Sequence, residues 1–410
     1  MRHRLPPALR LRDFGLLWTS SLANGLALQM LVVAIGWQVY AIHRNPLDLG
    51  FVGLAEFVPL PLLALPAGQL ADRAQRRLVV AVGLGFQVAI ATALVVITLS
   101  GAHELWPFLA IAVAAGITSA VSNPAGRALT PEVVPTELLP GAVALRSVAN
   151  QAGIVVGPAI GGVIFAVEPV AVYITAAALS LLACIAILGV RARAAAAPTT
   201  ELTWQNLSAG IGFILRTRML LGAISLDLVA VLLGDSIALA PVFARTILDV
   251  GPAGLGALRA APSAGALVAG LLLARRPLNY RAGPTLLAVV AAFGAMMIVF
   301  GLSRSLPLSL AALAVSGFAD MISMNIRATT VLLMTPPELQ GRVSSVEWVF
   351  ISASNELGAF ESGAVASLIG TAAAVVAGGA VMIGVAASWR RLFPPLARMG
   401  RLDELQPEPV

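Results

Sequence analysis

The feature that most constrains this chain is a succession of apolar stretches, each about as long as a lipid bilayer is thick. A helix needs about 20 apolar residues to cross the hydrocarbon core, and runs of that length follow one another along nearly all of the 410 residues. Of these residues, 59% are hydrophobic and 11% charged, against about 45–50% and about 25% in soluble domains. A water-soluble globular fold is excluded, and the sequence predicts an all-α polytopic membrane protein.

We place twelve transmembrane helices along the chain. The predicted ranges are 14–40, 49–71, 78–99, 105–126, 141–167, 169–190, 219–244, 252–274, 282–302, 306–326, 344–369 and 370–389. The last boundary is the weakest, because residues 362–389 run on with only Gly370 and Thr371 to mark a turn. A count of eleven helices would put the C-terminus on the outer side.

The positions of the arginines favour twelve helices. All 26 basic residues are arginine. Twenty-two of them lie in the segments that a twelve-helix arrangement places on the same side of the membrane. Arg44, Arg245 and Arg304 lie in the opposite segments, and Arg259 lies inside a span. By the positive-inside rule, both termini are expected in the cytoplasm. The net charge of +6 therefore reports orientation in a plasma (inner) membrane, and no nucleic-acid partner is expected.

The two halves of the chain share a plan at an offset of about 200 residues. Arg127-Ala128 precedes a Pro-x-Glu-Leu turn and a new span, and Arg327-Ala328 precedes a similar turn with Pro336-Pro337-Glu338-Leu339. Two matched six-helix bundles with a substrate path between them are typical of secondary transporters. The predicted organisation is a bundle at 1–190, a linker with an interfacial helix at 191–218, a second bundle at 219–390 and a cytoplasmic tail at 391–410.

The sequence does not contain the residues that metalloproteins, ATP-driven transporters and enzymes require. Cys184 is the single cysteine, and the three histidines are never within metal-ligand spacing of one another. No phosphate-binding glycine-rich loop is present, so ATP is not expected to drive transport. The sequence therefore predicts no cofactor, no metal and no enzymatic activity, and a membrane-embedded enzyme or a channel is the less favoured alternative.

A loop between the second and third predicted spans carries a gate-like motif. It runs from Gly68 through Asp72 and Arg73 to Arg76 and Arg77. A carboxylate at the end of a helix, followed by arginines, can pair with them or with a helix N-terminus and hold one conformation closed. The alternative is a simple positive-inside anchor.

This loop resembles the signature of the major facilitator superfamily, Gly-x-Leu-Ala-Asp-Arg-x-Gly-Arg-Arg, with Gln75 in place of the second glycine. The resemblance implies two six-helix bundles that alternate access, and it implies that Asp72, Arg73 and Arg76 act as conformational gate residues.

The fifth predicted span contains Gly153, Gly157, Pro158, Gly161 and Gly162 in the pattern Gly-x-x-x-Gly-Pro-x-x-Gly-Gly. Glycines four residues apart allow close helix packing, and proline permits a kink. An ordinary packing face is the alternative interpretation. The full pattern resembles the antiporter motif of the superfamily, which implies efflux.

Further segments are similar to the branch that contains the enterobactin exporter and macrolide efflux proteins. They are Asn123-Pro124-Ala-Gly-Arg127-Ala with Pro131-Glu132, Gly210 to Leu215, Thr335 to Val343, and Asn355-Glu-Leu-Gly358. Many proton-coupled relatives carry an arginine within the fourth span, whereas Arg127 lies at its inner end. The resemblance therefore leaves the coupling ion open.

Ionisable residues inside spans are costly and mark candidate functional sites. The acids and one amide that we take as a candidate proton or substrate path are Glu56, Asp227, Asp235, Asp320, Asn355, Glu356 and Glu361. Asp320 and Glu356 come out near the membrane midplane. The alternative for Asp320 is a structural pair with Arg327, seven residues later and about 20° away around the helix.

The sequence thus predicts a monomeric secondary transporter in the lipid bilayer. We expect it to export an amphipathic small molecule of drug or siderophore type, with protons as the coupling ion. A proton-coupled or facilitative importer of a small metabolite is the rival interpretation. Asn24, Gln29, Gln38, Asn150 and Gln151 either line a cavity or hydrogen-bond to neighbouring helices.

Overall fold

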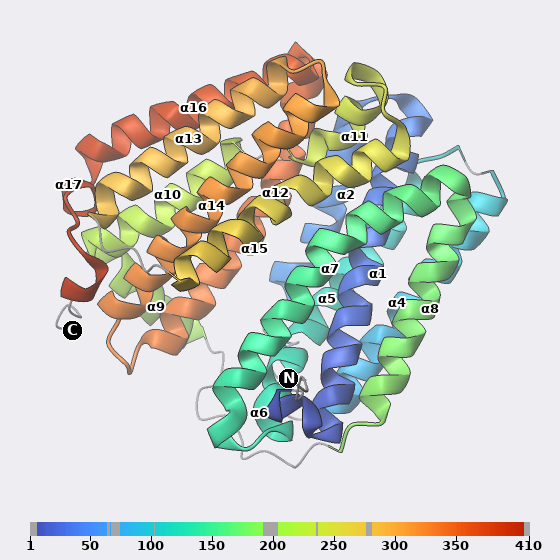
Figure 1. Cartoon of the computed structure of the whole chain (residues 1–410), viewed down its shortest axis with the longest axis horizontal. Helices are drawn as coiled ribbons and strands as arrows, with labels where there is room; N and C mark the ends of the chain where they lie inside the picture. Colours follow the sequence, from blue (N-terminus) through green and yellow to red (C-terminus); the bar gives the residue numbers. More distant parts are fainter. Residues whose placement is uncertain are drawn as a thin grey trace, which may run out of the picture. The chain divides into compact units, whose positions relative to one another are not determined.

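The computed structural model describes residues 6–63, 66, 74–101, 103–191, 204–234, 237–275 and 281–405. Within these ranges the chain is helical throughout and contains no strand. Figure 1 shows long helices joined by short connections. The predicted all-α polytopic fold is confirmed.

The first half of the chain supplies six long helices and a short one. They are α1 (Arg12–His43), α2 (Pro46–Phe57), α4 (Arg76–Leu99), α5 (Trp106–Ala128), α6 (Thr130–Val133), α7 (Leu139–Val167) and α8 (Pro169–Leu188). Every long helix falls within three residues of its predicted start. In this half, α4 and α8 lie side by side, as do α4 and α5.

The second half contains α9 (Trp204–Arg216), α10 (Arg218–Gly234), α11 (Ala240–Val242), α12 (Gly251–Arg275), α13 (Ala282–Leu302), α14 (Leu306–Met334), α15 (Gln340–Ile369), α16 (Thr371–Leu392) and α17 (Pro394–Ala397). The short helix α9 lies in the segment predicted as the linker, and its place at the membrane interface stays a prediction. Gly370 separates α15 from α16 with φ of 89°, a conformation that glycine adopts without strain. The chain therefore turns at the weakest predicted boundary.

Two predicted spans differ from the described helices. The span 219–244 matches one candidate span at Arg218–Ile247, but its described part from Ile237 onward consists of a 3₁₀ turn, α11 and a π-helical turn at Phe243–Ile247. The span ending at 326 instead continues to Met334, since residues 328–334 are apolar or threonine and no proline occurs before Pro336. Arg327 consequently lies inside α14 and not at its end.

Eleven of the described helical segments are long and apolar enough to cross a membrane. The remaining predicted span, 344–369, corresponds to α15, which has 30 residues and exceeds the length that a bilayer requires. This helix carries Arg342, Glu347, Glu356 and Glu361, and these charges lower its mean hydropathy below that of the other spans.

The described chain separates into two compact units. Unit 1 comprises residues 1–42, 55–201 and 251–260, and unit 2 comprises residues 43–54, 202–250 and 261–410. The exchanged pieces are parts of α2 and α12. Within unit 2, Gly363 of α15 packs on Gly50 of α2, and within unit 1, Gly162 of α7 packs on Gly256 of α12. Each unit thus includes part of a helix that the sequence assigned to the other bundle.

Each unit has its own apolar core. In unit 1, Phe14, Leu129 and Ile187 are fully buried in one cluster. In unit 2, Leu226, Leu286 and Ile326 are fully buried in another, which Leu396 of the C-terminal segment joins. That segment also accepts hydrogen bonds from the first amides of α13, at 2.7 Å from Ala282 N to Gly400 O. The residues after α16 are therefore packed against unit 2 as far as residue 405.

Candidate functional site

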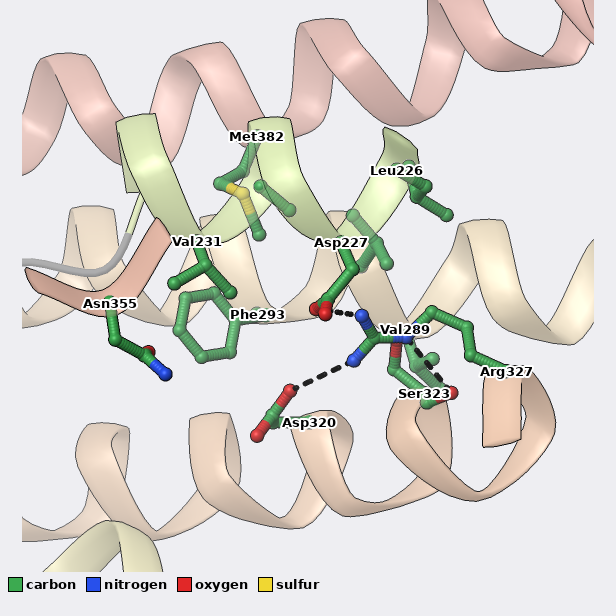
Figure 2. Close-up of a pocket in the computed structure, with 12 residues that line it drawn as sticks. Leu226, Asp227, Val231, Val289, Phe293, Asp320, Ser323, Arg327, Asn355 and Met382 are labelled. Carbon is green, nitrogen blue, oxygen red and sulfur yellow. Dashed lines mark hydrogen bonds and ion pairs between the residues drawn. The ribbon is translucent and has the colours of Figure 1, made fainter. Parts of the chain in front are cut away.

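A charged cluster lies among the apolar helices of unit 2 and centres on Arg327 of α14. Its guanidinium forms an ion pair with Asp227 of α10 through Nη1. Nη2 lies 3.8 Å from Oδ1 of Asp320, also on α14, and Nε donates to the carbonyl of Ser323 at 3.3 Å. Figure 2 shows the two carboxylates pointing toward Arg327.

Helix geometry explains how α14 supplies three members of the cluster. Asp320, Ser323 and Arg327 lie three and four residues apart, so they fall on one face over two turns. Asp227 then approaches from α10. The seven-residue spacing predicts the Asp320–Arg327 contact as the alternative for Asp320, and the structure shows that contact. Asp227 as the main partner was not predicted, because nothing in local spacing relates residues 100 positions apart.

The two carboxylates are held differently. The Asp227 side chain is 15% exposed and the Arg327 side chain 11% exposed, whereas the Asp320 side chain is 53% exposed. A buried charge is stable only when paired, so Asp227 and Arg327 depend on each other. Asp320 has the longer contact and greater access to water.

A cavity of about 100 Å³ adjoins the cluster and is lined by Asp227, Asp320, Ser323, Arg327 and Asn355 together with apolar side chains. Phe293 and Met382 contribute to its wall (Figure 2). A second cavity, of about 240 Å³, is lined by Asp227, Arg327 and Glu347. Arg327 thus faces acids from three helices, α10, α14 and α15.

The other predicted path residues lie elsewhere. Glu356 is adjacent to Asn355, but consecutive helical residues point about 100° apart. Its Oε2 lies 3.5 Å from the position that a Cβ on Gly53 of α2 would occupy. Glu361 is half-buried on α15. Glu56 is half-buried on α2, where its backbone packs against Gly116 of α5, and Asp235 lies outside the described residues.

Part of the gate-like motif can be placed. Arg76, at the start of α4, pairs with Glu132 of α6 at 2.6 Å, and both side chains are largely buried. Arg77 donates to the carbonyl of Val190 at 2.9 Å, just after α8. Gly68, Asp72 and Arg73 lie outside the described residues. The roles of all five as gate residues stay predictions.

The glycine motif of α7 forms two packing faces within unit 1. A Cβ on Gly153 would lie 2.8 Å from the carbonyl carbon of Gly25, and one on Gly157 or Gly161 would lie 2.6 Å from Gln29 Cβ or 2.8 Å from Met30 Cα. These three glycines face α1. Gly162 and the carbonyl of Pro158 face Gly256 of α12. The predicted close packing is confirmed, and the antiporter role stays a prediction.

A larger cavity, of about 760 Å³, lies on unit 1 among α1, α4, α5 and α7. Its polar lining residues are Ser20, Ser21, Asn24, Gln87, Ser119, Ser122, Asn123, Arg127, Thr130, Arg146, Ser147, Asn150 and Gln151. Asn24, Asn150 and Gln151 are among these lining residues. Gln38 instead bonds to Thr98 and Tyr173, as the alternative interpretation expected.

The comparisons with known proteins identify the family. A family model described as "Transmembrane secretion effector", a group within the major facilitator superfamily, matches residues 5–406. The chain belongs to this family. As a member of the transmembrane secretion effector family, the chain is a multi-pass membrane transporter. The described helices agree with this assignment.

Individual relatives are more distant. The chain is 26% identical over 379 residues to the uncharacterized MFS-type transporter YfiS of Bacillus subtilis, covering 89% of this chain and 88% of that protein. It is 29% identical over 136 residues to the staphyloferrin A transporter of Staphylococcus aureus, covering 33% and 34%. A crystal structure of the nucleoside transporter NupG superposes with a TM-score of 0.75 at 12% identity, covering 93% and 99%. This last likeness shows the fold alone.

Proposed function

We propose that this secretion effector family member is a secondary active exporter that works by alternating access and exchanges its substrate for protons. The observation that carries this proposal is the Asp227–Arg327–Asp320 cluster in unit 2. Ionisable groups within membrane helices are expensive to bury and are typical of ion and substrate pathways. A purely structural bundle would not need them.

The cluster has the charge balance of a proton-binding site. Two carboxylates contact one guanidinium, and Glu347 lines the adjoining cavity. The formal charge of these four groups is negative, so a proton can neutralise one acid without leaving Arg327 unpaired. Asp320 is the exposed acid with the longer contact, and we therefore assign it the exchangeable proton. Asn355 faces the same cavity and would orient a water or the substrate there.

Three observations support export over import. The family description names secretion, the glycine and proline pattern of α7 resembles the antiporter motif, and one relative is named for staphyloferrin A transport. This name, together with the sequence resemblance to the enterobactin exporter and macrolide efflux branch, favours a siderophore-type substrate. A drug-type amphipathic substrate has less support, because the described lining of the unit 1 cavity contains no aromatic side chain.

The proposal includes the topology that the arginines favour, with a plasma membrane location and both termini in the cytoplasm. It also assigns the Arg76–Glu132 contact to the cytoplasmic gate, where it ties the start of α4 to α6. Breaking that pair would separate the two helices when the gate rearranges. We further propose that the protein acts as a monomer.

Inverted membrane vesicles test direction and coupling together. Vesicles with an acidic lumen are offered radiolabelled citrate, ethidium and uridine as a carboxylate, an amphipathic cation and a neutral nucleoside. We expect transporter-dependent uptake of one compound that stops when nigericin collapses the pH gradient. Uptake that survives nigericin would contradict proton antiport, and uptake confined to right-side-out vesicles would establish the importer.

A further inference from the structure

The cavity of unit 1 combines a large polar lining with positive charge. Arg127 of α5 and Arg146 of α7 both line it, and none of its described lining residues is an aspartate or glutamate. Glu132, one residue beyond the lining residue Pro131, is engaged by Arg76 at 2.6 Å. The described part of the cavity therefore presents two guanidinium groups without an acid in its lining.

Arg146 is held by neutral groups. Its Nη1 donates to the carbonyl of Gly126 and to Oγ1 of Thr130, both at 2.7 Å. These bonds fix the guanidinium against α5, but they supply no negative charge. A partly buried cation gains stability from a counterion in a poorly hydrated site, and guanidinium groups bind carboxylate and phosphate oxygens through paired hydrogen bonds.

Neutral polar side chains in the same cavity point to a ligand with more than an anionic group. Asn123 of α5 and Asn150 of α7 line the cavity, and both residues are exposed. A side-chain amide both donates and accepts hydrogen bonds. Hydroxyl or amide groups of a bound molecule would pair with these two amides.

We propose that this cavity recognises a polar organic anion that carries carboxylate groups beside hydroxyl or amide groups, with Arg127 and Arg146 binding the carboxylates. The assignment rests on the proposed exporter function, because it names the substrate class that the exporter moves. The cavity extends from Leu17 to Leu28 along α1 and includes Arg127 near the end of α5, the end that the arginine distribution places toward the cytoplasm. An exported anion would enter there.

Citrate is a suitable probe because it combines three carboxylates with a hydroxyl group, and triethyl citrate is its neutral counterpart. Binding to the purified full-length protein in phosphatidylcholine nanodiscs would be measured by titration calorimetry. We expect citrate to bind, triethyl citrate not to bind, and Arg127→Gln to weaken citrate affinity by about tenfold or more, as for loss of one charge-assisted pair. Arg127→Lys should retain part of the affinity.

The matched control is Arg391→Gln, which removes the same charge from an exposed position at the end of α16 and should leave citrate affinity unchanged. Arg127 is itself exposed, so its replacement should not prevent folding. Arg146→Gln removes two hydrogen bonds, so its citrate affinity is compared with wild type only if its melting temperature is unchanged. Citrate affinity that is equal in wild type and Arg127→Gln would overturn the proposal.

Three further outcomes separate the possible sources of the anion and distinguish this proposal from the exporter proposal. If phosphatidylglycerol in the nanodisc displaces citrate and binds in an Arg127-dependent way, the site belongs to a lipid headgroup and the substrate assignment is wrong. If vesicles export ethidium and no carboxylate, the substrate class is wrong while the exporter stands. If citrate binds through Arg127 but no compound is transported, the exporter proposal alone fails.

Discussion

Arg127 and Arg327 occupy equivalent positions in the two halves of the chain, 200 residues apart and each followed by alanine, yet their surroundings differ in charge. Arg327 contacts Asp227 and Asp320 inside unit 2. Arg127 lines the unit 1 cavity with Arg146, and no acid is among the described lining residues. The same residue at the same place in the repeat therefore has two chemical settings.

The difference shows that a repeated sequence plan fixes position but not function. Helix α14 places Asp320 two turns before Arg327, whereas the residue two turns before Arg127 is Ala120. Likewise α10 supplies Asp227, and the position 200 residues earlier is Ala27. Under the two proposals, these two apolar-to-acid differences distinguish an arginine that binds an anionic substrate from one that pairs with acids inside its own unit. We assign substrate charge to unit 1 and proton exchange to unit 2.

The largest predicted effect is on the stability of unit 2. Arg327→Gln leaves Asp227 largely buried without its cation, and removing one partner of a buried pair costs about 3–5 kcal/mol. We expect a strong loss of folded protein in detergent, measured by size-exclusion yield and tryptophan fluorescence melting. Arg127→Gln, in the equivalent position, should melt within about 1 kcal/mol of wild type because Arg127 is exposed.

A double variant sharpens this prediction. Asp227→Asn combined with Arg327→Gln removes both charges and should recover much of the stability that Arg327→Gln loses. Equal destabilisation by Arg127→Gln and Arg327→Gln would show that the two settings are energetically alike, and the comparison would fail.

The next effect concerns helix packing in the two units. Gly157→Ala on α7 brings a methyl group within 2.6 Å of Gln29 Cβ, and Gly358→Ala on α15 brings one within 2.9 Å of the carbonyl oxygen of Val231. Such overpacking costs about 1–3 kcal/mol, which a fall in melting temperature would report.

Each helix offers its own control for that experiment. Gly141 on α7 and Gly341 on α15 are 200 residues apart, and a Cβ at either position meets no atom within 4 Å. Gly141→Ala and Gly341→Ala should therefore be neutral or slightly stabilising. If these variants destabilise as much as the other two, close packing is not what the glycines provide.

The smallest effect on stability is expected for Asp320→Asn. The side chain is 53% exposed and 3.8 Å from Arg327, and exposed ion pairs contribute about 0–1 kcal/mol. The variant should fold, but its transport should no longer depend on pH, because the exchangeable carboxyl is gone. Asp403→Asn, which removes an exposed acid paired with Arg401 outside the bundles, serves as the control and should keep the pH profile.

Glu356→Gln tests the other acid that the sequence placed near the midplane. Since its carboxylate lies beside Gly53 of α2 and not in the cavity of unit 2, we expect a retained pH profile. A flat profile in Glu356→Gln and a normal one in Asp320→Asn would move the proton site to the α2–α15 contact.

Much of the fold was predictable from hydropathy and turn residues. The apolar runs set the helix positions, and Gly370 set the last turn, because bilayer thickness and backbone sterics act locally along the chain. The end of α14 was missed because apolar residues continue past Arg327 with no helix breaker. The irregular turns from Ile237 to Ile247 were missed for the same reason, since the surrounding sequence stays largely apolar.

The site was less predictable. Asp320 was singled out because a lone acid in an apolar run is conspicuous, but its neighbour Asp227 comes from a helix about 100 residues earlier. Arg146 was not among the predicted site residues, yet it lies two turns inside α7 and lines the unit 1 cavity. Which helices face one another depends on tertiary packing, and single-sequence periodicity does not encode it.

We assign substrate binding to Arg127 in unit 1 and proton exchange to Asp320 in unit 2. The most direct test is citrate uptake into inverted vesicles, measured against lumen pH for wild type, Arg127→Gln and Asp320→Asn. We expect Arg127→Gln to raise the citrate KM about tenfold or more with an unchanged pH profile. We expect Asp320→Asn to flatten the pH profile with an unchanged KM. If both variants alter the same parameter, or neither alters any, substrate charge and proton exchange are not divided between Arg127 and Asp320.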